Sequence, residues 1–196
     1  MFTGIIHHSG LFMGYHHGKK EIAVEAPELV PRLETGASLA VDGVCLSLVR
    51  IEKAVLFFDL SPETVEKTTL GSLRPKAKLN LELPVTPQSL LSGHLVTGHV
   101  DAAGKVRKIV PRGPGKRITI SFPADLRPYF APKGSVAVNG ISLTLAELSI
   151  SSFDVEIIPL TLRETNLNGL RAGDRVNLEC DILGKYVYNW LAQGNK

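Results

Sequence analysis

The stretch VDGVCLSLV, from Val41 to Val49, returns with few changes as VNGISLTLA, from Val138 to Ala146. The two stretches are offset by 97 residues, and at this offset residues 38–82 and 135–179 share 15 identities in 45 positions without a gap. Two copies of about 90 residues have too long a period for a solenoid and are too few for a propeller. The sequence therefore predicts a duplicated domain.

Alternating apolar and polar residues predict short β-strands inside each copy, as in Glu21–Ala26, Lys78–Leu83 and Arg117–Phe122. Gly and Pro interrupt these runs at close intervals, which favours a closed barrel or a sandwich over βαβ units. Short helical turns are expected at Ser61–Thr68, where Ser61 can cap and Pro62 can start a turn, and at Pro159–Thr165. Both copies are thus expected to be all-β units.

The C-terminal segment Asp181–Gln193 departs from this pattern. Leu183, Val187, Trp190 and Leu191 recur at helical spacing and form one apolar stripe. We expect a helix whose stripe packs on the body of the protein or on the same helix of another subunit.

Three units are expected along the chain. The boundaries we predict are an N-terminal barrel over residues 1–89, a C-terminal barrel over 90–182 and a helix for oligomerisation over 183–196, with the linker near Pro84–Gly93. A single copy would bury only a small core, so the two copies should dock or oligomerise.

The composition favours a small-molecule ligand. Lys and Arg number 22 against 19 Asp and Glu, a formal net charge of +3, and no basic run suggests a nucleic-acid or membrane surface. No apolar run reaches the roughly 20 residues that cross a bilayer, and the N-terminus lacks the features of a signal peptide. Two cysteines, Cys45 and Cys180, are too few for a disulfide framework. We expect a soluble cytoplasmic protein.

Five motifs in this order make the chain resemble the riboflavin synthases, which carry two lumazine-binding repeats. The motifs are MFTGII (Met1–Ile6), VDGVCLSL (Val41–Leu48), SGHLVTGHVD (Ser92–Asp101), VNGISLTL (Val138–Leu145) and NLECDILGKY (Asn177–Tyr186). The resemblance implies two similar six-stranded Greek-key β-barrels and a C-terminal α-helix that helps to assemble a homotrimer. A surrounding shell of lumazine synthase is a possible further partner.

The resemblance also implies a reaction that needs no cofactor. One molecule of 6,7-dimethyl-8-ribityllumazine gives a four-carbon unit to a second, which yields riboflavin and 5-amino-6-ribitylaminouracil. The substrates are chemically identical but must act as donor and acceptor, so the informative positions are those where the repeats differ. Cys45 corresponds to Ser142, His99 to Ile5, Asp181 to Pro84 and Lys133 to Gly36.

In this family the productive site lies between the N-terminal barrel of one subunit and the C-terminal barrel of its neighbour. Cys45, with Ser38 nearby, is then a candidate nucleophile or donor at C7 of the lumazine. His99 could move a proton of the 7-methyl group. In the C-terminal barrel, Ser142, Thr144 and Asp181 could shuttle protons or orient a hydroxyl, and Lys133 could stabilise an anion.

The resemblance implies a larger set of binding residues, several of them through their backbones. Glycine in the opening segments permits close approach to a flat ring. The set comprises Gly4, Ile5, Ile6, Cys45, Leu46, Ser47, Asp59, Leu60, Ser61, Pro62, Glu63, Thr64, Gly98, His99, Val100, Lys133, Ser142, Leu143, Thr144, Ile157, Ile158, Pro159, Leu160, Thr161 and Leu162.

Other interpretations remain open at this point. A strand cysteine is often a small core residue, Asp181 could be only a helix N-cap, and Cys180, which has no partner in the other repeat, is expected to be inert. The pairs His7-His8 and His16-His17 could face each other across a hairpin, but they lack the carboxylate or cysteine pattern of a metal site. Arg112–Lys116 is expected to be a hairpin turn. A rival class is a fluorescent antenna of the same fold, which binds lumazine or flavin without catalysis.

Overall fold

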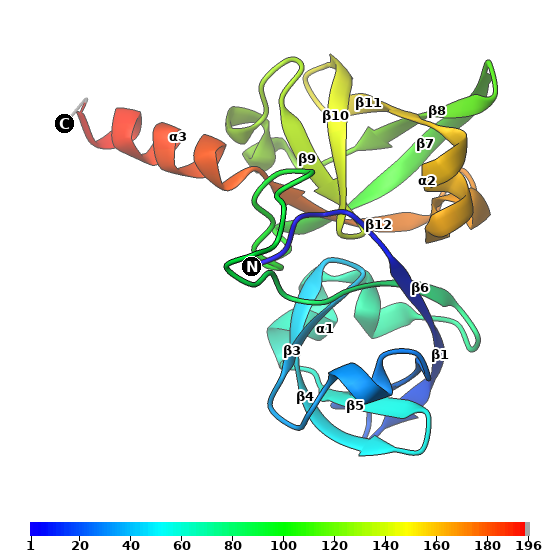
Figure 1. Cartoon of the computed structure of the whole chain (residues 1–196). Coiled ribbons are helices and arrows are strands. Elements are labelled where there is room, and N and C mark those ends of the chain that lie inside the picture. Colours follow the sequence, from blue (N-terminus) through cyan, green and yellow to red (C-terminus); the bar gives the residue numbers. More distant parts are fainter. Residues whose placement is uncertain (195–196) are drawn as a thin grey trace.

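Two closed β-barrels and one projecting helix make up the computed structural model, which describes residues 1–194 (Figure 1). The N-terminal barrel has the cyclic strand order β1-β2-β5-β4-β3-β6, and the C-terminal barrel has the equivalent order β7-β8-β11-β10-β9-β12. In each ring the second strand is followed by the fifth and not by the third, which is a Greek-key path. The predicted pair of six-stranded barrels is confirmed.

The strands of the two barrels correspond one to one. In the first they are β1 (His8–His16), β2 (Glu21–Glu25), β3 (Ser38–Val41), β4 (Val44–Glu52), β5 (Val55–Asp59) and β6 (Lys78–Glu82). In the second they are β7 (Ala102–Arg112), β8 (Gly115–Ser121), β9 (Ser135–Val138), β10 (Ile141–Leu148), β11 (Ser152–Ile157) and β12 (Arg175–Cys180).

Short helices follow the fifth strand of each barrel, as the sequence predicts: α1 (Pro62–Lys67) and α2 (Pro159–Glu164). Ser61 caps α1, because its Oγ accepts the backbone N–H of Thr64 at 3.1 Å. Short 3-10 helices cover Val30–Arg32, Thr69–Ser72, Ala124–Tyr129 and Asn166–Gly169. The turn expected at Arg112–Lys116 is the tight connection between β7 and β8, in which Arg112 pairs with Gly115.

Apolar side chains fill both barrels along the predicted alternation. Ile22 and Val24 on β2, and Ile118 and Ile120 on β8, are fully buried. The C-terminal core also contains three phenylalanines whose ring centroids lie 4.8–5.8 Å apart, at positions 122, 130 and 153. Each barrel thus has its own hydrophobic core.

The barrels meet where two equivalent hairpin turns touch, Asp42-Gly43 and Asn139-Gly140. A Cβ added to Gly43 would lie 2.6 Å from the backbone nitrogen of Gly140, and one added to Gly140 would lie 2.7 Å from that of Gly43. Both glycines have φ near +80° (+79° and +78°). Only glycine permits this backbone contact, because any side chain would collide.

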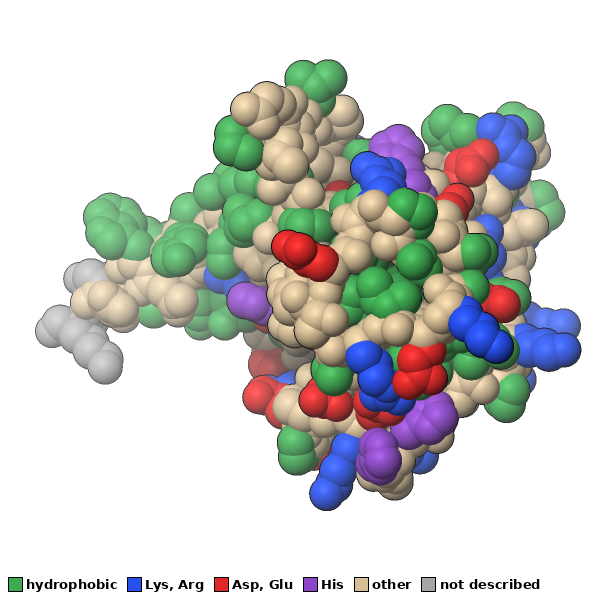
Figure 2. Space-filling model, turned by 60° about the horizontal axis from the view of Figure 1, so that its bottom comes forward, with side chains coloured by type: hydrophobic (Ala, Val, Ile, Leu, Met, Phe, Trp, Pro, Cys, Tyr) green, Lys and Arg blue, Asp and Glu red, His purple; other side chains and the backbone are tan. Residues whose placement is uncertain are grey.

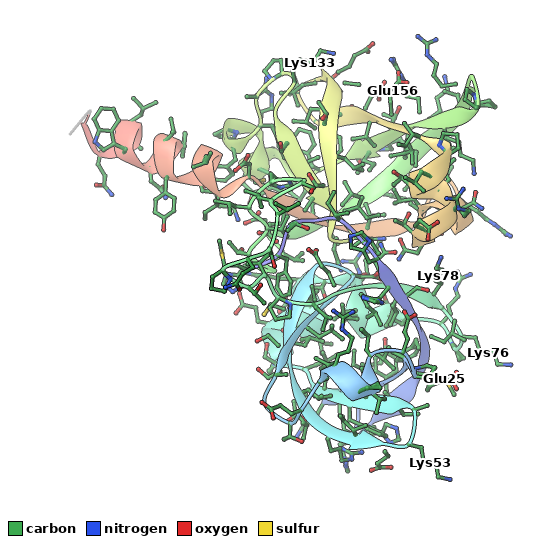
Figure 3. The ribbon with its side chains drawn as sticks, viewed as in Figure 1. Glu25, Lys53, Lys76, Lys78, Lys133 and Glu156 are labelled. Carbon is green, nitrogen blue, oxygen red and sulfur yellow. The ribbon has the colours of Figure 1, made fainter. Side chains whose placement is uncertain are left out.

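Reciprocal hydrogen bonds extend the contact between barrels. Asn80 Nδ2 donates to the carbonyl of Asn139 at 2.9 Å, and Asn177 Nδ2 donates to the carbonyl of Asp42 at 2.9 Å. Lys78, labelled in Figure 3 near the place where the barrels meet, donates to the carbonyl of Thr165 at 3.4 Å. The duplication therefore extends to the interface, where each repeat supplies the same kind of bond to the other.

The helix α3 (Ile182–Gly194) leaves the C-terminal barrel and projects from the body. The predicted helix is confirmed, and its apolar residues are exposed: Leu183, Tyr186, Val187, Trp190 and Leu191 are each more than half accessible. Figure 2 shows hydrophobic side chains along this projection. Within residues 1–194, no helix has the length and apolar character needed to span a membrane.

Candidate functional site

The opening segments of the two repeats cross between the barrels. Phe2 and Val96 pair with each other, with N–H···O distances of 2.7 and 3.1 Å. Each segment is also tied to the last strand of its own barrel by a glutamate. Glu82 on β6 accepts the N–H groups of Thr3 and Gly4 at 2.6 and 3.0 Å, and Glu179 on β12 accepts those of residues 97 and 98 at the same distances.

Each opening segment then contacts a strand of the other barrel. The Cys45 N–H on β4 donates to the carbonyl of Gly98, and the Ser142 N–H on β10 donates to the carbonyl of Gly4, both at 2.8 Å. A Cβ at Gly98 would lie 2.5 Å from Cys45 Cβ, and one at Gly4 would lie 2.7 Å from Ser142 Cβ. The glycines of the opening segments thus bring backbone directly against Cys45 and Ser142, which are equivalent positions with different side chains.

Cys45 lies in a hollow of about 340 Å³ on the N-terminal barrel. The hollow brings together six residues predicted from the sequence, namely Cys45, Glu63, Thr64, Gly98, His99 and Val100. Cys45 is half-buried and His99 is exposed, so both can reach a ligand there. His99 comes from the second repeat, which shows that this hollow is built by both halves of the chain.

Three residues that line the Cys45 hollow were not predicted, namely Val44, Lys67 and Thr68, and neither was Glu82. Lys67 lines the Cys45 hollow, where its Nζ donates to Glu63 Oε1 at 2.8 Å. The four-residue spacing of Glu63 and Lys67 on an expected helical turn is the signal that could have indicated this pair. Glu82 stood in the repeated NLE motif, but sequence identity alone did not show that it anchors an opening segment.

Ser142 has a histidine partner that was not predicted from the sequence. His94 Nδ1 lies 2.7 Å from Ser142 Oγ, and His94 is 8% exposed. Burial lowers the pKa of the His94 imidazole, and the negative charge of Asp181 offsets part of that effect. His94 belongs to the SGHLVTGHVD motif, so its residue type was visible, but its contact with a strand 48 residues later was not.

Asp181 lies at the start of α3, where its Oδ1 accepts the N–H of Leu183 at 3.0 Å. This bond is the capping role considered from the sequence, and the Asp181 carboxylate also raises the pKa of His94, against the larger effect of burial. Cys180 is buried in the C-terminal core, and burial raises the pKa of its thiol far above the usual range. A thiol in that state is a poor nucleophile.

Ser38 is not in the Cys45 hollow. On β3 it pairs with Ser47, whereas Cys45 pairs with Ala40. Ser38 lines a larger hollow of about 940 Å³, together with Ile5, His8 and the segment from Leu83 to Ser92. The structure thus assigns Ser38 and Cys45 to adjacent but separate hollows.

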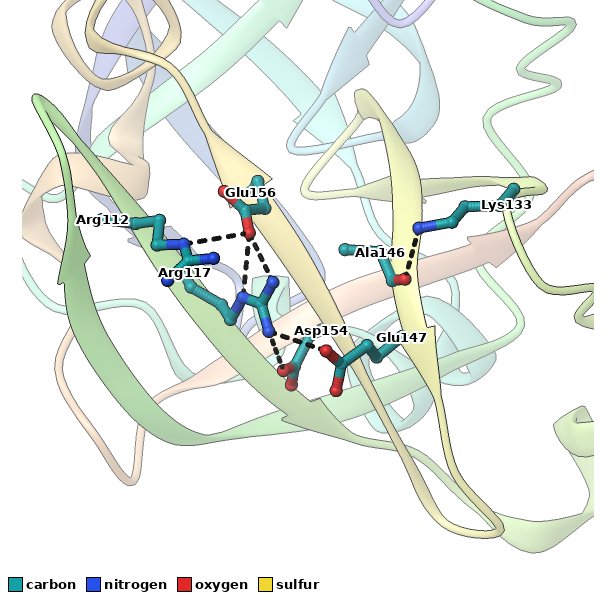
Figure 4. Close-up of polar contacts among 7 residues, drawn as sticks. All are labelled: Arg112, Arg117, Lys133, Ala146, Glu147, Asp154 and Glu156. Atoms are coloured by element: carbon teal, nitrogen blue, oxygen red, sulfur yellow. Dashed lines mark hydrogen bonds and ion pairs between the residues drawn. The ribbon is translucent and has the colours of Figure 1, made fainter.

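Lys133 contacts β10 at a point some distance from Ser142. Its Nζ donates to the carbonyl of Ala146 at 2.8 Å (Figure 4). Ala146 is four residues beyond Ser142, about 13 Å along an extended strand. Thr144 lies between them and is exposed. Figure 3 shows Lys133 at the end of the C-terminal barrel that is remote from the N-terminal barrel.

On the same barrel, Arg117 forms ion pairs with neighbouring carboxylates. Arg117 Nη1 lies 2.9 Å from Glu147 Oε1, and Arg117 Nε lies 3.0 Å from Glu156 Oε1 (Figure 4). These contacts lie on β8, β10 and β11. Because its guanidinium has carboxylate partners, Arg117 is not a free cation for an anionic ligand.

The remaining predicted binding residues fall into two groups by exposure. Five have side chains buried against a barrel core, so any contact with a ligand would come from their backbones: Ile6, Leu46, Leu60, Ile157 and Leu162. The others are exposed or half-buried: Ser47, Asp59, Ser61, Pro62, Leu143, Ile158, Pro159, Leu160 and Thr161.

The histidine pairs considered as metal ligands do not face each other. His8 and His16 are the first and last residues of β1, with His7 and His17 beside them, so the pairs lie at opposite ends of one strand. The hairpin juxtaposition is therefore wrong, because the whole of one strand separates the pairs. Within residues 1–194, no three His, Cys, Asp or Glu side chains are grouped closely enough to hold a metal ion.

Comparison with known sequences gives full-length matches. The lumazine-binding domain matches residues 3–84 and again 97–181. The riboflavin synthase of Actinobacillus pleuropneumoniae is 35% identical over 193 residues, covering 97% of this chain and 90% of the relative. That of Bacillus subtilis is 32% identical and covers 100% and 92%, and that of Mycobacterium tuberculosis is 37% identical and covers 95% and 96%.

Comparison with solved structures identifies the same architecture. The crystal structure of LumP complexed with riboflavin superposes with a TM-score of 0.85 at 26% identity, covering 92% of this chain and 99% of LumP. LumP complexed with 6,7-dimethyl-8-(1'-D-ribityl) lumazine superposes with a TM-score of 0.81 at 25% identity, covering 91% and 98%.

Proposed function

Because the chain belongs to the riboflavin synthase family, with both of its lumazine-binding domains present, we propose that it converts two molecules of 6,7-dimethyl-8-ribityllumazine into riboflavin and 5-amino-6-ribitylaminouracil. One molecule loses a four-carbon unit and the other gains it. Every atom of the products comes from the two substrates, so the reaction requires no oxidant, reductant or cofactor.

The observation that carries this proposal is the unlike chemistry of two equivalent positions. Cys45 and Ser142 have the same backbone bond to an opening segment, but one supplies a thiol and the other a hydroxyl beside an imidazole. Two such sites can hold the same heterocycle in different states. Holding two reactants in a fixed orientation can lower a barrier by about 7–11 kcal/mol.

On the N-terminal barrel, Cys45 adds to the electron-poor C7 of one lumazine: the thiol proton passes to His99, and the π electrons of the ring bond at C7 move into the pteridine. In a lumazine without that adduct, His99 accepts or returns a proton of the 7-methyl group. Their common hollow supports this pairing of roles. Ser38 contacts the lumazine from the adjacent surface of the same barrel.

On the C-terminal barrel, Ser142 and Thr144 act on the second lumazine, with Asp181 supplying negative charge near the protons they carry. Both hydroxyls lie on β10, two residues apart. To stabilise the anion that forms when the methyl proton leaves, Lys133 must move its side chain from the carbonyl of Ala146 back along β10 toward Ser142. The remaining predicted residues contact the ring edge and the ribityl chain.

We also propose that the protein works as a cytoplasmic homotrimer, with the complete site formed by the N-terminal barrel of one copy and the C-terminal barrel of the next. The exposed apolar residues of α3 support assembly, because a soluble protein rarely leaves such a stripe uncovered. Lumazine synthase is a candidate further partner.

The test is to incubate the purified protein with 6,7-dimethyl-8-ribityllumazine alone and to follow the absorbance of riboflavin. Cys45→Ala and His99→Ala should each slow turnover by about tenfold or more. His17→Asn is the matched control, because His17 lies in the turn after β1 and its φ of +51° suits asparagine. Tight binding without turnover would favour the second candidate function, a lumazine- or flavin-binding protein, which the likeness to ligand-bound LumP supports.

A further inference from the structure

His94 is a buried histidine with one ring nitrogen satisfied and the other not. Nδ1 lies 2.7 Å from Ser142 Oγ. Nε2 is buried and, within residues 1–194, has no hydrogen-bond partner. A buried polar atom without a partner costs free energy of folding, so such atoms are rare in native proteins. Here the atom without a partner belongs to a histidine that contacts Ser142, a position at which the two barrels differ.

The backbone fixes the position of this imidazole. The His94 N–H donates to the carbonyl of Thr3 at 3.2 Å. A Cβ on the preceding Gly93 would lie 2.1 Å from that carbonyl oxygen and 2.9 Å from Ser142 Cβ. The segment is thus held between the first opening segment and β10, and only glycine at position 93 allows so close an approach. The contact with Ser142 is therefore built into the backbone.

Burial lowers the pKa of the His94 imidazole more than the charge of Asp181 raises it, which favours the neutral form. A neutral imidazole carries one proton. With the proton on Nε2, Nδ1 accepts from the Ser142 hydroxyl and can take its proton. With the proton on Nδ1, the ring donates to Ser142 and cannot do so. The two tautomers give the serine opposite properties.

We propose that His94 is a positioning residue for Ser142, orienting its hydroxyl and holding its proton while Ser142 Oγ exchanges a proton with the lumazine on the C-terminal barrel. This inference rests on the proposed function. The proton leaves the substrate for Oγ as the serine proton moves to Nδ1, and the electron pair of the broken bond stays on the substrate. The resulting imidazolium is stabilised by Asp181, and the reverse transfer restores the neutral pair. No oxidant or reductant is required.

A double-mutant cycle tests whether His94 acts through Ser142. In His94→Asn, the amide can still bond to Ser142 Oγ from near the place of Nδ1, but it cannot take a proton. We expect His94→Asn and Ser142→Ala each to lower kcat by roughly 100-fold, with KM changed by less than about threefold. The double variant should be no slower than the slower single variant by more than about threefold. His17→Asn is the control for a histidine-to-asparagine exchange elsewhere.

Full kcat in His94→Asn, or losses that multiply in the double variant, would overturn the inference. Turnover of the parent protein tests the proposed function separately, since only ratios between variants bear on His94. If His94→Asn does not fold, an NMR measurement on the parent protein still tests the role of His94. The ¹⁵N spectrum of its histidine rings should show the proton of His94 on Nε2 and should change at His94 in Ser142→Ala. A proton on Nδ1 in the parent would contradict the role.

Discussion

Cys45 and Ser142 occupy equivalent places in the two repeats, yet their surroundings differ. Each donates its N–H to the carbonyl of a glycine in an opening segment, at 2.8 Å in both cases. Cys45 then faces a hollow that it shares with His99, whereas Ser142 is closed in by Gly93 and His94. The duplication has kept the backbone arrangement and changed the side-chain chemistry, which would let one fold treat two copies of a substrate differently, as we propose.

The hairpin turns at the barrel interface differ in the same way. Asp42 Oδ1 accepts the N–H of Asn80, and Asn139 Oδ1 accepts the N–H of Asn177, both at 2.8 Å. The geometry is the same, but one acceptor can ionise. Burial raises the pKa of Asp42 from 3.8 to about 7, against the opposing effect of its hydrogen bonds.

The largest predicted effect comes from making these hairpins alike with Asp42→Asn. The folded protein holds a proton on Asp42 up to about pH 7, whereas the unfolded chain loses it near pH 3.8. The stabilisation from this group is therefore complete below pH 3.8 and is lost as the pH rises through 7. Asp42→Asn should remove this loss and raise the free energy of unfolding at pH 8 by up to about 4 kcal/mol.

Urea unfolding of both proteins between pH 4 and 8 measures this difference. The reciprocal variant Asn139→Asp should steepen the fall in stability over the same pH range, because it adds a second carboxyl group at the equivalent position. Parallel pH curves for Asp42→Asn and the parent would contradict the assignment of this pH dependence to Asp42.

Gly98→Ala should have the next largest effect. The new Cβ would collide with Cys45 Cβ, and the residue has a φ of +83°, so overpacking adds to backbone strain. Together these cost about 3 kcal/mol of unfolding free energy. Gly36→Ala is the matched control, since its φ is +91° but nothing lies within 4 Å of the added Cβ. Equal losses in the two variants, by thermal or urea unfolding, would show that contact with Cys45 costs nothing.

Cys45→Ser makes the two equivalent positions alike and should lower kcat by roughly 100-fold, because a hydroxyl is a much weaker nucleophile than a thiol. The measurement is riboflavin formation at saturating lumazine. Val49→Ala, at an exposed position on the same strand, is the control. Unchanged kcat in Cys45→Ser would mean that the difference between the repeats at this position is not used in the reaction.

The smallest effect concerns the helices after the fifth strands. Ser61 caps α1, but Ile158 at the equivalent position cannot cap α2. Ile158→Ser should therefore stabilise the protein by about 0.5–1 kcal/mol, because Ile158 is 58% exposed and little packing is lost. Ser61→Ala should have the opposite sign. A lower melting temperature for Ile158→Ser would show that the α2 turn does not need a cap.

The repeat made the fold predictable. The offset of 97 residues, the alternation in the strands and the helical spacing after Asp181 gave the barrels and the helix, because these are local or internal patterns. Within the candidate site, the grouping of Cys45 with His99 followed from the family resemblance. The separation of Ser38 from Cys45, and the distance of Lys133 from Ser142, depend on strand register and on a side chain's choice of partner. A single sequence does not encode these visibly.

The role of His94 could not be predicted for a similar reason. Its motif was recognised, but its contact is with Ser142, on a strand that the motif does not contain. The crossing of the opening segments was also hidden, because each segment resembles the start of its own repeat while its glycine contacts the other one. Long-range contacts between repeats were the part that sequence periodicity could not supply.

The most direct test of the unlike roles of the two barrels is a crystal structure of the protein with a non-reacting lumazine analogue at saturating concentration. We predict two analogues for each pair of barrels, one with its pteridine beside Cys45 and His99 and the other beside Ser142 and His94. Analogues bound away from the Cys45 thiol and the His99 imidazole, or identical contacts in both barrels, would contradict the claim that the repeats give one heterocycle two different environments.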